Sequence, residues 1–415
     1  MNTIGIDFGT SNSVAAVCEG DDVVRFAEFP DGRIGNPTVI YFPGNRRDYY
    51  VGRDGIDTYF EDLEHGLTGG RLMFSIKSLL PDVKFDHTLV SKHGHLTPSD
   101  LCGRYLFKVK TLAETQFGLT FDRVLLGRPV DFSDFAVGRL EAAARIAGLD
   151  EVDFVLEPLA AAAAYTSESG SPELVFVVDL GGGTSDTCIV EVTRERRLQI
   201  GNPEAIKAVG GIRVAGDALS SRVFLEKLGP KFGAGSTYLS LGRQLPFPVH
   251  ILQKLSHWSR VNLIRAGGDL KTIAGILPYS DRPEEVERLL SLVKDHLGYE
   301  TYKAVEAAKI ELSTEDASEI RYGRLGLDES ITRAEFEQLC GDIFESIHQS
   351  ILETCRSASI DPGRIDKVLL TGGTSQIPYI QHTIESIFKL ERIMRPGYFS
   401  SVASGLGHLT AQFPR

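Results

Sequence analysis

The sequence predicts an α/β protein built from two related lobes, because two patterns each occur twice along its 415 residues. The first pattern is a hydrophobic strand ending in an aspartate, then a glycine-containing turn, a threonine or serine and a second strand. It occurs as IGIDFGTSNS at 4–13 and as VVDLGGGTSD at 177–186. The second pattern is a short apolar run typical of a buried strand, DRVLLG at 122–127 and DKVLLT at 366–371. The shared order indicates a duplicated fold.

The two halves carry insertions of unequal length. Asp179 follows Asp7 by 172 positions, whereas Asp366 follows Asp122 by 244, so the second half holds 72 more inserted residues. We expect a first lobe at 1–170, with its core at 1–38 and 98–170 and an inserted subdomain at 39–97. We expect a second lobe at 171–415, with its core at 171–226 and 341–415 and a mainly helical insertion at 227–340. The SGSP segment at 169–172 would mark the boundary between the lobes.

Further elements are expected in order along the chain. Ser133 and Asp134 would cap a helix over 135–146, which would stop at Gly148. A strand at 152–156 would lead into an alanine-rich helix at 159–167 that starts after Glu157 and Pro158. Later elements are a glycine turn at 210–217 before a helix, loops near 229–237 and 278–283, and helices over 332–358, 378–388 and 401–411.

Composition limits the classes of protein. The chain is 42% hydrophobic and 24% charged, as is usual for a soluble globular protein, and no apolar run approaches the ~18 residues of a membrane span. The first residues show no signal-peptide pattern, and the 5 cysteines are scattered without a CxxC pair, which favours the reducing cytoplasm. A net charge of −12 argues against nucleic acid or an acidic membrane as the main partner.

The residue types in the two hairpin turns suit a phosphate site. Glycines let several backbone N–H groups converge on phosphate oxygens, and threonine or serine adds a hydroxyl donor. Aspartates cannot face phosphate alone, so Asp7 and Asp179 imply a divalent cation, most naturally Mg²⁺ with part of its water shell. Each turn taken alone could equally be a hairpin whose glycines serve the strand twist.

Together these motifs resemble the ATPase domain of the seventy-kilodalton heat-shock chaperones, within the actin and sugar-kinase superfamily. The resemblance also includes EAAKIELS at 306–313, GGTSQIP at 372–378, and the segments 143–149 and 157–158. It spans nearly the whole chain and is similar to short bacterial members with the ATPase part only. It implies the duplicated actin-like, ribonuclease-H-like fold, two lobes each with an inserted subdomain, and a nucleotide at the base of the cleft.

The resemblance assigns roles at the phosphate end of ATP or ADP. Asp7 and Asp179 would hold hydrated Mg²⁺. Lys77 would reach the γ-phosphate and the attacking water, and Glu157 would orient that water or couple the site to Pro129. The phosphate loops would be formed by Gly9, Thr10, Ser11, Asn12, Gly181, Gly182, Gly183 and Thr184. The catalytic set would be Lys77, Glu157, Asp179 and Thr184.

The resemblance also assigns the adenosine end. Glu306, Lys309 and Ser313 fall at i, i+3 and i+7, one face of a helix, and would contact ribose and adenine. The remaining nucleotide contacts would come from Gly216, Gly372, Gly373, Thr374 and Gln376.

Most of these residues also have a structural interpretation that the sequence leaves open. A strand-end aspartate is often a turn residue, and a lone lysine on a helix is usually solvated. Glu157 could start the helix that follows it and favour that helix's dipole. Glu306 and Lys309 could form an ordinary surface ion pair.

The chain departs from the family pattern in several places. Gln376 stands where the family usually has an arginine over the adenine, and the glycine turn is altered around 215–217. The segment 395–401 lacks an acidic residue of the family, and 227–290 align poorly. The family's linker and peptide-gripping β-sandwich are expected to be absent, because nothing follows the last helix.

The resemblance implies slow ATP hydrolysis gated by lobe closure, in a chaperone-related or regulatory role with a chaperone or co-chaperone partner. A small-molecule kinase of the same superfamily is one alternative. A nucleotide-sensing or assembly module that does not hydrolyse ATP is another.

Overall fold

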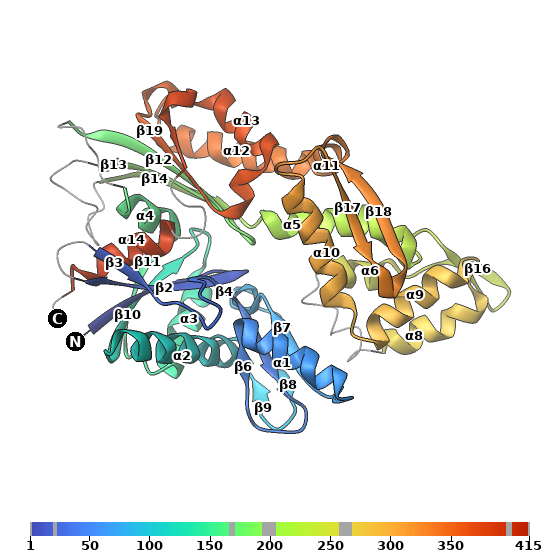
Figure 1. The fold of residues 1–415 in the computed structure, drawn as a ribbon. Coiled ribbons are helices and arrows are strands. Elements are labelled where there is room, and N and C mark those ends of the chain that lie inside the picture. Colours follow the sequence, from blue (N-terminus) through green and yellow to red (C-terminus); the bar gives the residue numbers. More distant parts are fainter. Residues whose placement is uncertain are drawn as a thin grey trace. The chain divides into compact units, whose positions relative to one another are not determined.

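The repeated hairpins lie in two sheets that have the same strand order (Figure 1). The computed structural model describes residues 2–19, 23–165, 171–192, 205–256, 268–395 and 401–413. The chain forms two compact units. Unit 1 holds 1–215, 347–375 and 381–415, and unit 2 holds 216–346 and 376–380. Both sheets belong to unit 1. The predicted division into two lobes near 170 stays a prediction, and its boundary at 169–170 lies outside the described residues.

The first sheet has the order β11-β10-β1-β2-β3. Its strands are β1 (Asn2–Phe8), β2 (Asn12–Glu19), β3 (Val23–Phe26), β10 (Phe121–Arg128) and β11 (Glu151–Leu156), with β4 (Asn36–Pro37) beside β2. β1 and β2 form the predicted antiparallel hairpin, with Asp7 opposite Val14. The apolar strand β10 runs parallel to β1, which places the first hairpin beside the first buried run.

The second sheet has the order β14-β13-β12-β19-β20, which repeats the first sheet's pairing of hairpin and buried strand. Its strands are β12 (Glu173–Leu180), β13 (Ser185–Val192), β14 (Ile206–Ile212), β19 (Lys367–Thr371) and β20 (Ile393–Met394). The hairpin β12–β13 is antiparallel with Asp179 opposite Asp186, and β19 runs parallel to β12. The duplication predicted from the two motifs is confirmed at the level of strand topology.

Two short helices share one core with both sheets. α4 (Glu157–Ala163) packs on β10, β11, β12, β13 and β19, and α14 (Ser401–Thr410) packs on α4, β1, β2, β3 and β10. The sequence counted α14 with the second lobe, whereas the structure places it on the first sheet. This core is closed by side chains from both halves, including Leu125, Leu159, Val177, Leu369 and Leu406.

The first sheet is completed by longer helices and the inserted segment. α2 (Pro98–Phe117) begins at a capping box formed by Thr97 and Asp100 and packs against α3 (Asp134–Ile146). The inserted segment contains β5 (Val39–Phe42), β6 (Tyr50–Val51), α1 (Gly52–Glu64), β7 (Arg71–Phe74), the 3-10 turn η1 (Ile76–Leu79), and the hairpin β8 (Thr88–Val90) with β9 (Gly94–Leu96). Strand residues Ile4, Ile6 and Leu126 join Leu106 and Leu140 in the core beneath these helices.

Two predicted helices differ from their expected bounds, one in each half, and two helices of the second half keep them closely. The helix expected over 332–358 is broken at Cys340 into α11 (Arg333–Leu339) and α12 (Gly341–Ser357). Gly341, a poor helix former, lies at this break. The alanine-rich helix expected at 159–167 is α4, which already ends at Ala163. α13 (Pro378–Ile387) and α14 agree closely with the helices expected at 378–388 and 401–411.

Unit 2 contains more strands than the sequence analysis predicted. Its helices are α5 (Gly216–Val223), α6 (Val249–Ser256), α8 (Asp269–Ile276), α9 (Pro283–Lys294), α10 (Gly298–Glu311) and α11. Its hairpins are β15 (Thr237–Ser240) with β16 (Arg243–Pro246), and β17 (Ala317–Tyr322) with β18 (Leu327–Thr332). In β17 Ser318 and Ile320 are buried between exposed neighbours, and this alternation is the pattern that a mainly helical prediction missed. Along the described residues, we find no helix that combines the length and the apolar character needed to cross a membrane.

The contact between α4 and α14 leaves no room for a side chain at Gly405. A Cβ atom there would lie 1.6 Å from the carbonyl oxygen of Ala160. We therefore expect Gly405→Ala to lower the free energy of unfolding by about 1–3 kcal/mol, as overpacked cores do, measured by urea denaturation.

The matched control is Gly138→Ala in α3, where a Cβ meets no atom within 4 Å. This change should raise stability by up to about 1 kcal/mol through helix propensity. Equal effects of the two substitutions would contradict the packing argument.

Candidate functional site

The first phosphate-loop motif follows β1 and is held in place by Thr38. A Cβ atom at Gly9 would lie 2.2 Å from the carbonyl oxygen of Asn12, so only glycine fits this turn. The Thr38 hydroxyl donates to the carbonyl oxygen of Gly9 at 2.7 Å, and the Thr38 N–H donates to that of Ser11 at 2.9 Å. Sequence reasoning missed Thr38, because no local motif marks a residue that acts 29 positions away.

The second phosphate-loop motif follows β12 and is held by the segment after β19. The Thr374 hydroxyl donates to the carbonyl oxygen of Gly181 at 2.7 Å. Gly372 has φ of +81°, and a Cβ there would lie 2.2 Å from the carbonyl oxygen of Leu180. The predicted residues Gly372 and Thr374 therefore adjoin the second loop, whatever they bind.

The two loop motifs meet in unit 1. A Cβ atom built on Gly183 would lie 2.9 Å from Oγ1 of Thr10 and 3.3 Å from its Cβ. Because glycine has no side chain, the second loop can approach Thr10 this closely. The structure thus brings together two segments that lie more than 170 positions apart in the chain, as the sequence analysis expected. Thr10 of the first loop and Gly183 of the second are the points of contact.

Lys77 is buried against the start of α4 and is not solvated. It lies in η1, is 2% exposed, and its Nζ is 2.6 Å from Oε1 of Glu157, which is 8% exposed. The ring centroid of Phe132 is 5.6 Å from the same nitrogen. The ordinary surface-lysine interpretation is therefore wrong. Glu157 is the first residue of α4, so it both starts a helix and forms a buried ion pair.

Arg139 of α3 fixes the segment that follows Lys77. Its Nη1 donates to the carbonyl oxygens of Leu79, Leu80 and Asp82 at 3.3, 3.3 and 3.0 Å, and its Nη2 donates to that of Phe85 at 3.1 Å. The guanidinium carbon also lies 4.2 Å from the ring centroid of Phe135. No motif announced this residue, since a guanidinium binding four backbone oxygens has no sequence pattern.

Three aspartates near this ion pair have raised pKa values. Burial first, and then the negative charge of Glu157, raise the pKa of Asp7 to about 7, while Lys77 opposes the shift. Burial also raises the pKa of Asp179 well above its usual value, with Glu157, Asp7 and Asp186 adding to the effect. Glu157 thus acts on all three aspartates, and Lys77 opposes the shift at Asp7 and Asp179.

Asp186 is the third of these aspartates and was not in the predicted set. It faces Asp179 across the hairpin, and its Oδ1 accepts a 2.8 Å hydrogen bond from the Val130 N–H. Burial and then Glu157 raise its pKa to about 7, while hydrogen bonds from Thr184 and Val130 lower it. A second aspartate in the hairpin, at the start of β13, was the sequence signal that could have identified it.

The predicted adenosine residues Gly216 and Lys309 meet in unit 2. The ammonium of Lys309 on α10 donates to the carbonyl oxygen of Gly216 at 3.1 Å and to Oγ of Ser220 at 2.9 Å. Burial lowers the pKa of Lys309, while Glu306 and Asp217 raise it. Glu306 forms its ion pair with Lys303 at 3.7 Å.

Two other predicted adenosine residues, Ser313 and Gln376, lie at or just beyond the ends of helical elements. Ser313 follows the end of α10 at Glu311, so the expected single helix face holds for Glu306 and Lys309 only. Gln376 ends a 3-10 turn that starts at Gly373, and it is partly exposed. The altered family segment at 395–401 lies, apart from its two ends, outside the described residues.

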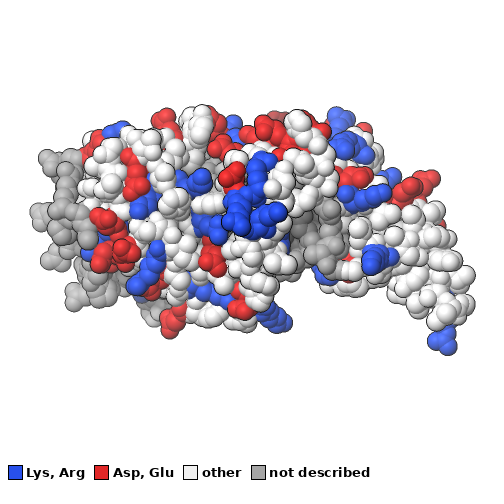
Figure 2. Space-filling model, turned by 90° about the horizontal axis from the view of Figure 1, so that it is seen from below, with Lys and Arg blue, Asp and Glu red and all other residues white. Residues whose placement is uncertain are grey.

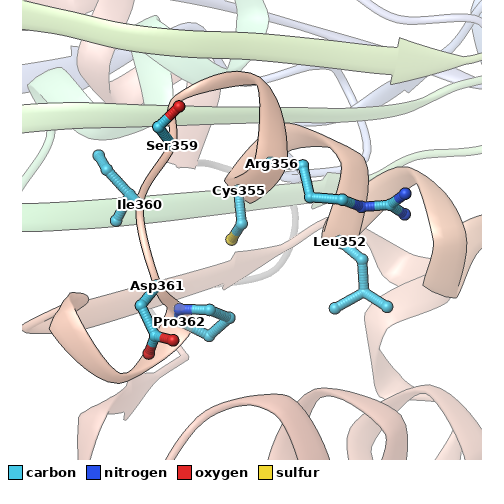
Figure 3. A pocket seen from close by; sticks show the side chains of 7 residues that line it. All are labelled: Leu352, Cys355, Arg356, Ser359, Ile360, Asp361 and Pro362. Carbon is cyan, nitrogen blue, oxygen red and sulfur yellow. The ribbon is translucent and has the colours of Figure 1, made fainter.

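A pocket of about 520 Å³ lies at the end of α12 and involves none of the predicted residues (Figure 3). Its lining is largely apolar and comes from Leu352, Cys355, Arg356, Ser359, Ile360, Asp361 and Pro362. Its charged members are already engaged. Arg356 pairs with Glu353 at 3.1 Å, and Asp361 accepts from the Gly363 N–H at 2.7 Å. The pocket offers no constellation for phosphate chemistry.

Arg139 should be essential for order around Lys77. We expect Arg139→Leu to cost about 2–3 kcal/mol of unfolding free energy, because it leaves four carbonyl oxygens without their charged donor. Hydrogen exchange of the amides over 77–85 should speed up in the same variant. The control is Arg145→Leu on the same helix, whose exposed pair with Glu141 should contribute less than about 1 kcal/mol. Similar losses in both variants would contradict the assigned role.

The raised pKa of Asp7 makes stability depend on pH. A buried carboxyl whose pKa is about 7 in the folded chain and near its usual value in the unfolded chain binds a proton on folding, so it destabilises the fold as pH rises from 4 to 7. Asp7→Asn removes this effect. Relative to the parent, the variant should gain about 1–3 kcal/mol between pH 5 and pH 8 in metal-free buffer, measured by urea unfolding. A difference that stays constant with pH would rule out the shift.

Comparison with known proteins agrees with this arrangement. The family model described as "Hsp70 protein" matches residues 3–216 and 292–396. A curated relative, "Chaperone protein DnaK" of Mycoplasmoides gallisepticum, is 27% identical over 397 residues. The alignment covers 92% of this chain and 55% of the relative, so the chain spans about half the relative's length. The family match leaves out 217–291, which includes the whole segment expected to align poorly, 227–290. The chain belongs to the Hsp70 family.

Proposed function

We propose that the chain binds ATP and ADP with Mg²⁺ and hydrolyses ATP slowly, in a chaperone-related or regulatory role. The observation that carries the proposal is the meeting of the two loop motifs at Thr10 and Gly183. The buried Lys77–Glu157 pair and the strand-end aspartates add the charges that phosphoryl transfer requires. None of the five cysteines forms a disulfide within the described residues, which supports a reducing compartment such as the cytoplasm, with chaperone or co-chaperone proteins as partners.

The loops would bind phosphate oxygens through backbone N–H groups and hydroxyls. Residues 9–12 and 181–184 contain glycines, which leave backbone N–H groups accessible to a phosphate. Thr10, Ser11 and Thr184 add hydroxyl donors. Thr38 and Thr374 hold the carbonyl oxygens of Gly9 and Gly181, one in each loop. Such fixed donors stabilise transferred charge better than donors that must reorganise.

The aspartate cluster suits a divalent cation. Burial and then the negative charge of Glu157 raise the pKa values of Asp7, Asp179 and Asp186, and Lys77 opposes the shift at Asp7 and Asp179. In the described residues, no three His, Cys, Asp or Glu side chains gather closely enough to hold an ion by themselves. Two aspartates would suffice for Mg²⁺ that keeps waters and binds phosphate. When bound, Mg²⁺ would neutralise charge on the β- and γ-phosphates.

Lys77 and Glu157 would act on the γ-phosphate and the attacking water. Phosphoryl transfer to water depends mainly on positioning and charge neutralisation, so no covalent chemistry is asked of the protein. The Lys77 ammonium would balance charge on the transferred phosphoryl group. The Glu157 carboxylate would accept a hydrogen bond from the water. Lys77 would hold that carboxylate in place, since its Nζ lies 2.6 Å from Oε1 of Glu157.

The adenosine end of the proposal rests on the family motifs. Gly216, Glu306, Lys309 and Ser313 would contact ribose and base, together with Gly372, Gly373, Thr374 and Gln376. Lys309 already binds the Gly216 carbonyl oxygen, so we propose that it also shapes the altered turn at 215–217. Gln376 has no cation to place over the adenine ring, and the loss of this interaction would weaken base binding.

Turnover and stability can be separated at the buried pair. Lys77→Met should lower ATP turnover by about 10²–10³-fold with Mg²⁺ present, because a charge that stabilises the transition state is lost. It should also destabilise the fold, since Glu157 is left buried without its partner. The double variant Lys77→Met, Glu157→Gln should regain stability but stay inactive. Turnover is measured by phosphate release and stability by thermal unfolding.

Binding measurements distinguish the alternatives. Calorimetry should show ADP binding that requires Mg²⁺ and is weakened by Asp7→Asn. Tight binding without turnover in the parent would favour a nucleotide-sensing module. ATP consumption that needs a defined metabolite would favour a small-molecule kinase. Unchanged turnover in Lys77→Met would overturn the assignment of Lys77.

A further inference from the structure

The inserted segment and α2 together present a compact cluster of positive charge. Arg104 and Lys108 on α2 lie over the ring of Tyr49. Arg47 after β5 acts with Arg104 on His93, and Lys92 precedes His93 in the turn between β8 and β9. We call this set, Arg47, Tyr49, Lys92, Arg104 and Lys108, the Tyr49 patch. The face seen in Figure 2 shows Lys and Arg side chains gathered in one place among scattered Asp and Glu. In a chain of net charge −12, such a cluster does not follow from composition.

Tyr49 anchors the patch. The guanidinium carbon of Arg104 lies 5.4 Å from its ring centroid, and the ammonium nitrogen of Lys108 lies 5.2 Å from it. Arg104 and Lys108 are one helical turn apart, a spacing at which like charges repel, so the ring offsets part of that repulsion. Below Tyr49 lies the ring of Phe42, 6.1 Å away and 1% exposed. The Tyr49 ring is therefore held against the buried core.

The cations of the patch lack acidic partners. Within the part of the chain that the structure describes, Arg47, Lys92, Arg104 and Lys108 form no ion pair with Asp or Glu. The neighbouring Arg46 does, with Asp62 at 3.2 Å and Asp48 at 4.0 Å. These positive charges affect the pKa of His93. After burial, the positive charges of Arg104 and Arg47 lower its pKa, and Asp48 opposes them.

We propose that the Tyr49 patch binds a short acidic segment of a partner protein. The arginine guanidinium matches a carboxylate in a bidentate geometry, and the flexible lysines can follow carboxylates along an extended chain. Tyr49 adds a half-buried apolar surface for the segment's backbone and for the aliphatic parts of its side chains. The site lies outside the residues proposed for ATP, so this inference goes beyond the proposed function.

The surroundings favour a short protein segment over a long polyanion. α1 packs on β5 and β6 of the same inserted segment and carries Asp54, Asp57, Glu61 and Glu64. A nucleic acid or a membrane surface that extends over the inserted segment beyond the patch would be repelled by these carboxylates. A segment of a few acidic residues engages the cations alone.

A peptide of eight glutamates with a fluorescent label is the probe. We expect it to bind the full chain at low salt, with affinity that falls as salt is raised, measured by fluorescence anisotropy. Arg104→Gln with Lys108→Gln should weaken the binding about tenfold. The matched control is Arg243→Gln with Lys271→Gln, two exposed cations of unit 2, which makes the same change in net charge. It should leave binding within about twofold.

Three results would overturn the proposal. One is no binding of the peptide at low salt. Another is equal weakening in the control, which would show that net charge alone matters. The third is tighter, patch-dependent binding of a single-stranded RNA oligonucleotide or of vesicles rich in phosphatidylserine. Thermal unfolding of both double variants checks that each remains folded, and Tyr49→Leu provides a second substitution that removes the ring without changing charge.

Discussion

The electrostatics of the site depend on one buried ion pair. Lys77 and Glu157 lie 2.6 Å apart with less than a tenth of each residue exposed. A charge buried alone costs several kcal/mol, so the pair persists only because its geometry is good. Glu157 is the first residue of α4, whereas Lys77 belongs to the inserted segment. Arg139 binds backbone oxygens of the residues that follow Lys77. The pair therefore ties the inserted segment to the helix between the sheets.

The three neighbouring aspartates share two causes of their raised pKa values. Burial is the larger cause for Asp7, Asp179 and Asp186, and the negative charge of Glu157 is the second. Ionising such a cluster works against the stability of the fold, and for Asp7 the loss grows as pH rises from about 4 to about 7. Proteins keep strained or repelling groups mainly where function requires them. The raised pKa values of these buried aspartates thus identify a candidate functional site independently of any motif.

The sequence was sufficient for features that depend on local pattern. The hairpins at Asp7 and Asp179, the strands β10 and β19 and the helices α3, α13 and α14 are each set by a run of apolar residues and a turn or cap. It was insufficient where contacts are distant. Thr38 acts across 29 positions and Arg139 across more than 50, and neither carries a recognisable motif. The break at Cys340 and the hairpin β17–β18 were missed for another reason: their weak local signals lay in a segment already read as helical.

The packing of α4 and α14 explains why the two loops meet. Chain order alone suggests that each lobe keeps its own helices, yet α14 covers the first sheet and α4 contacts both. Gly405 lets α14 approach the Ala160 carbonyl oxygen, and the shared core joins Leu125 of the first sheet to Val177 and Leu369 of the second. The strands that end in Asp7 and Asp179 are thereby held against one apolar layer. The separation of the two loops is then determined by side-chain packing, because Thr10 and Gly183 meet only when both strands lie on this shared layer.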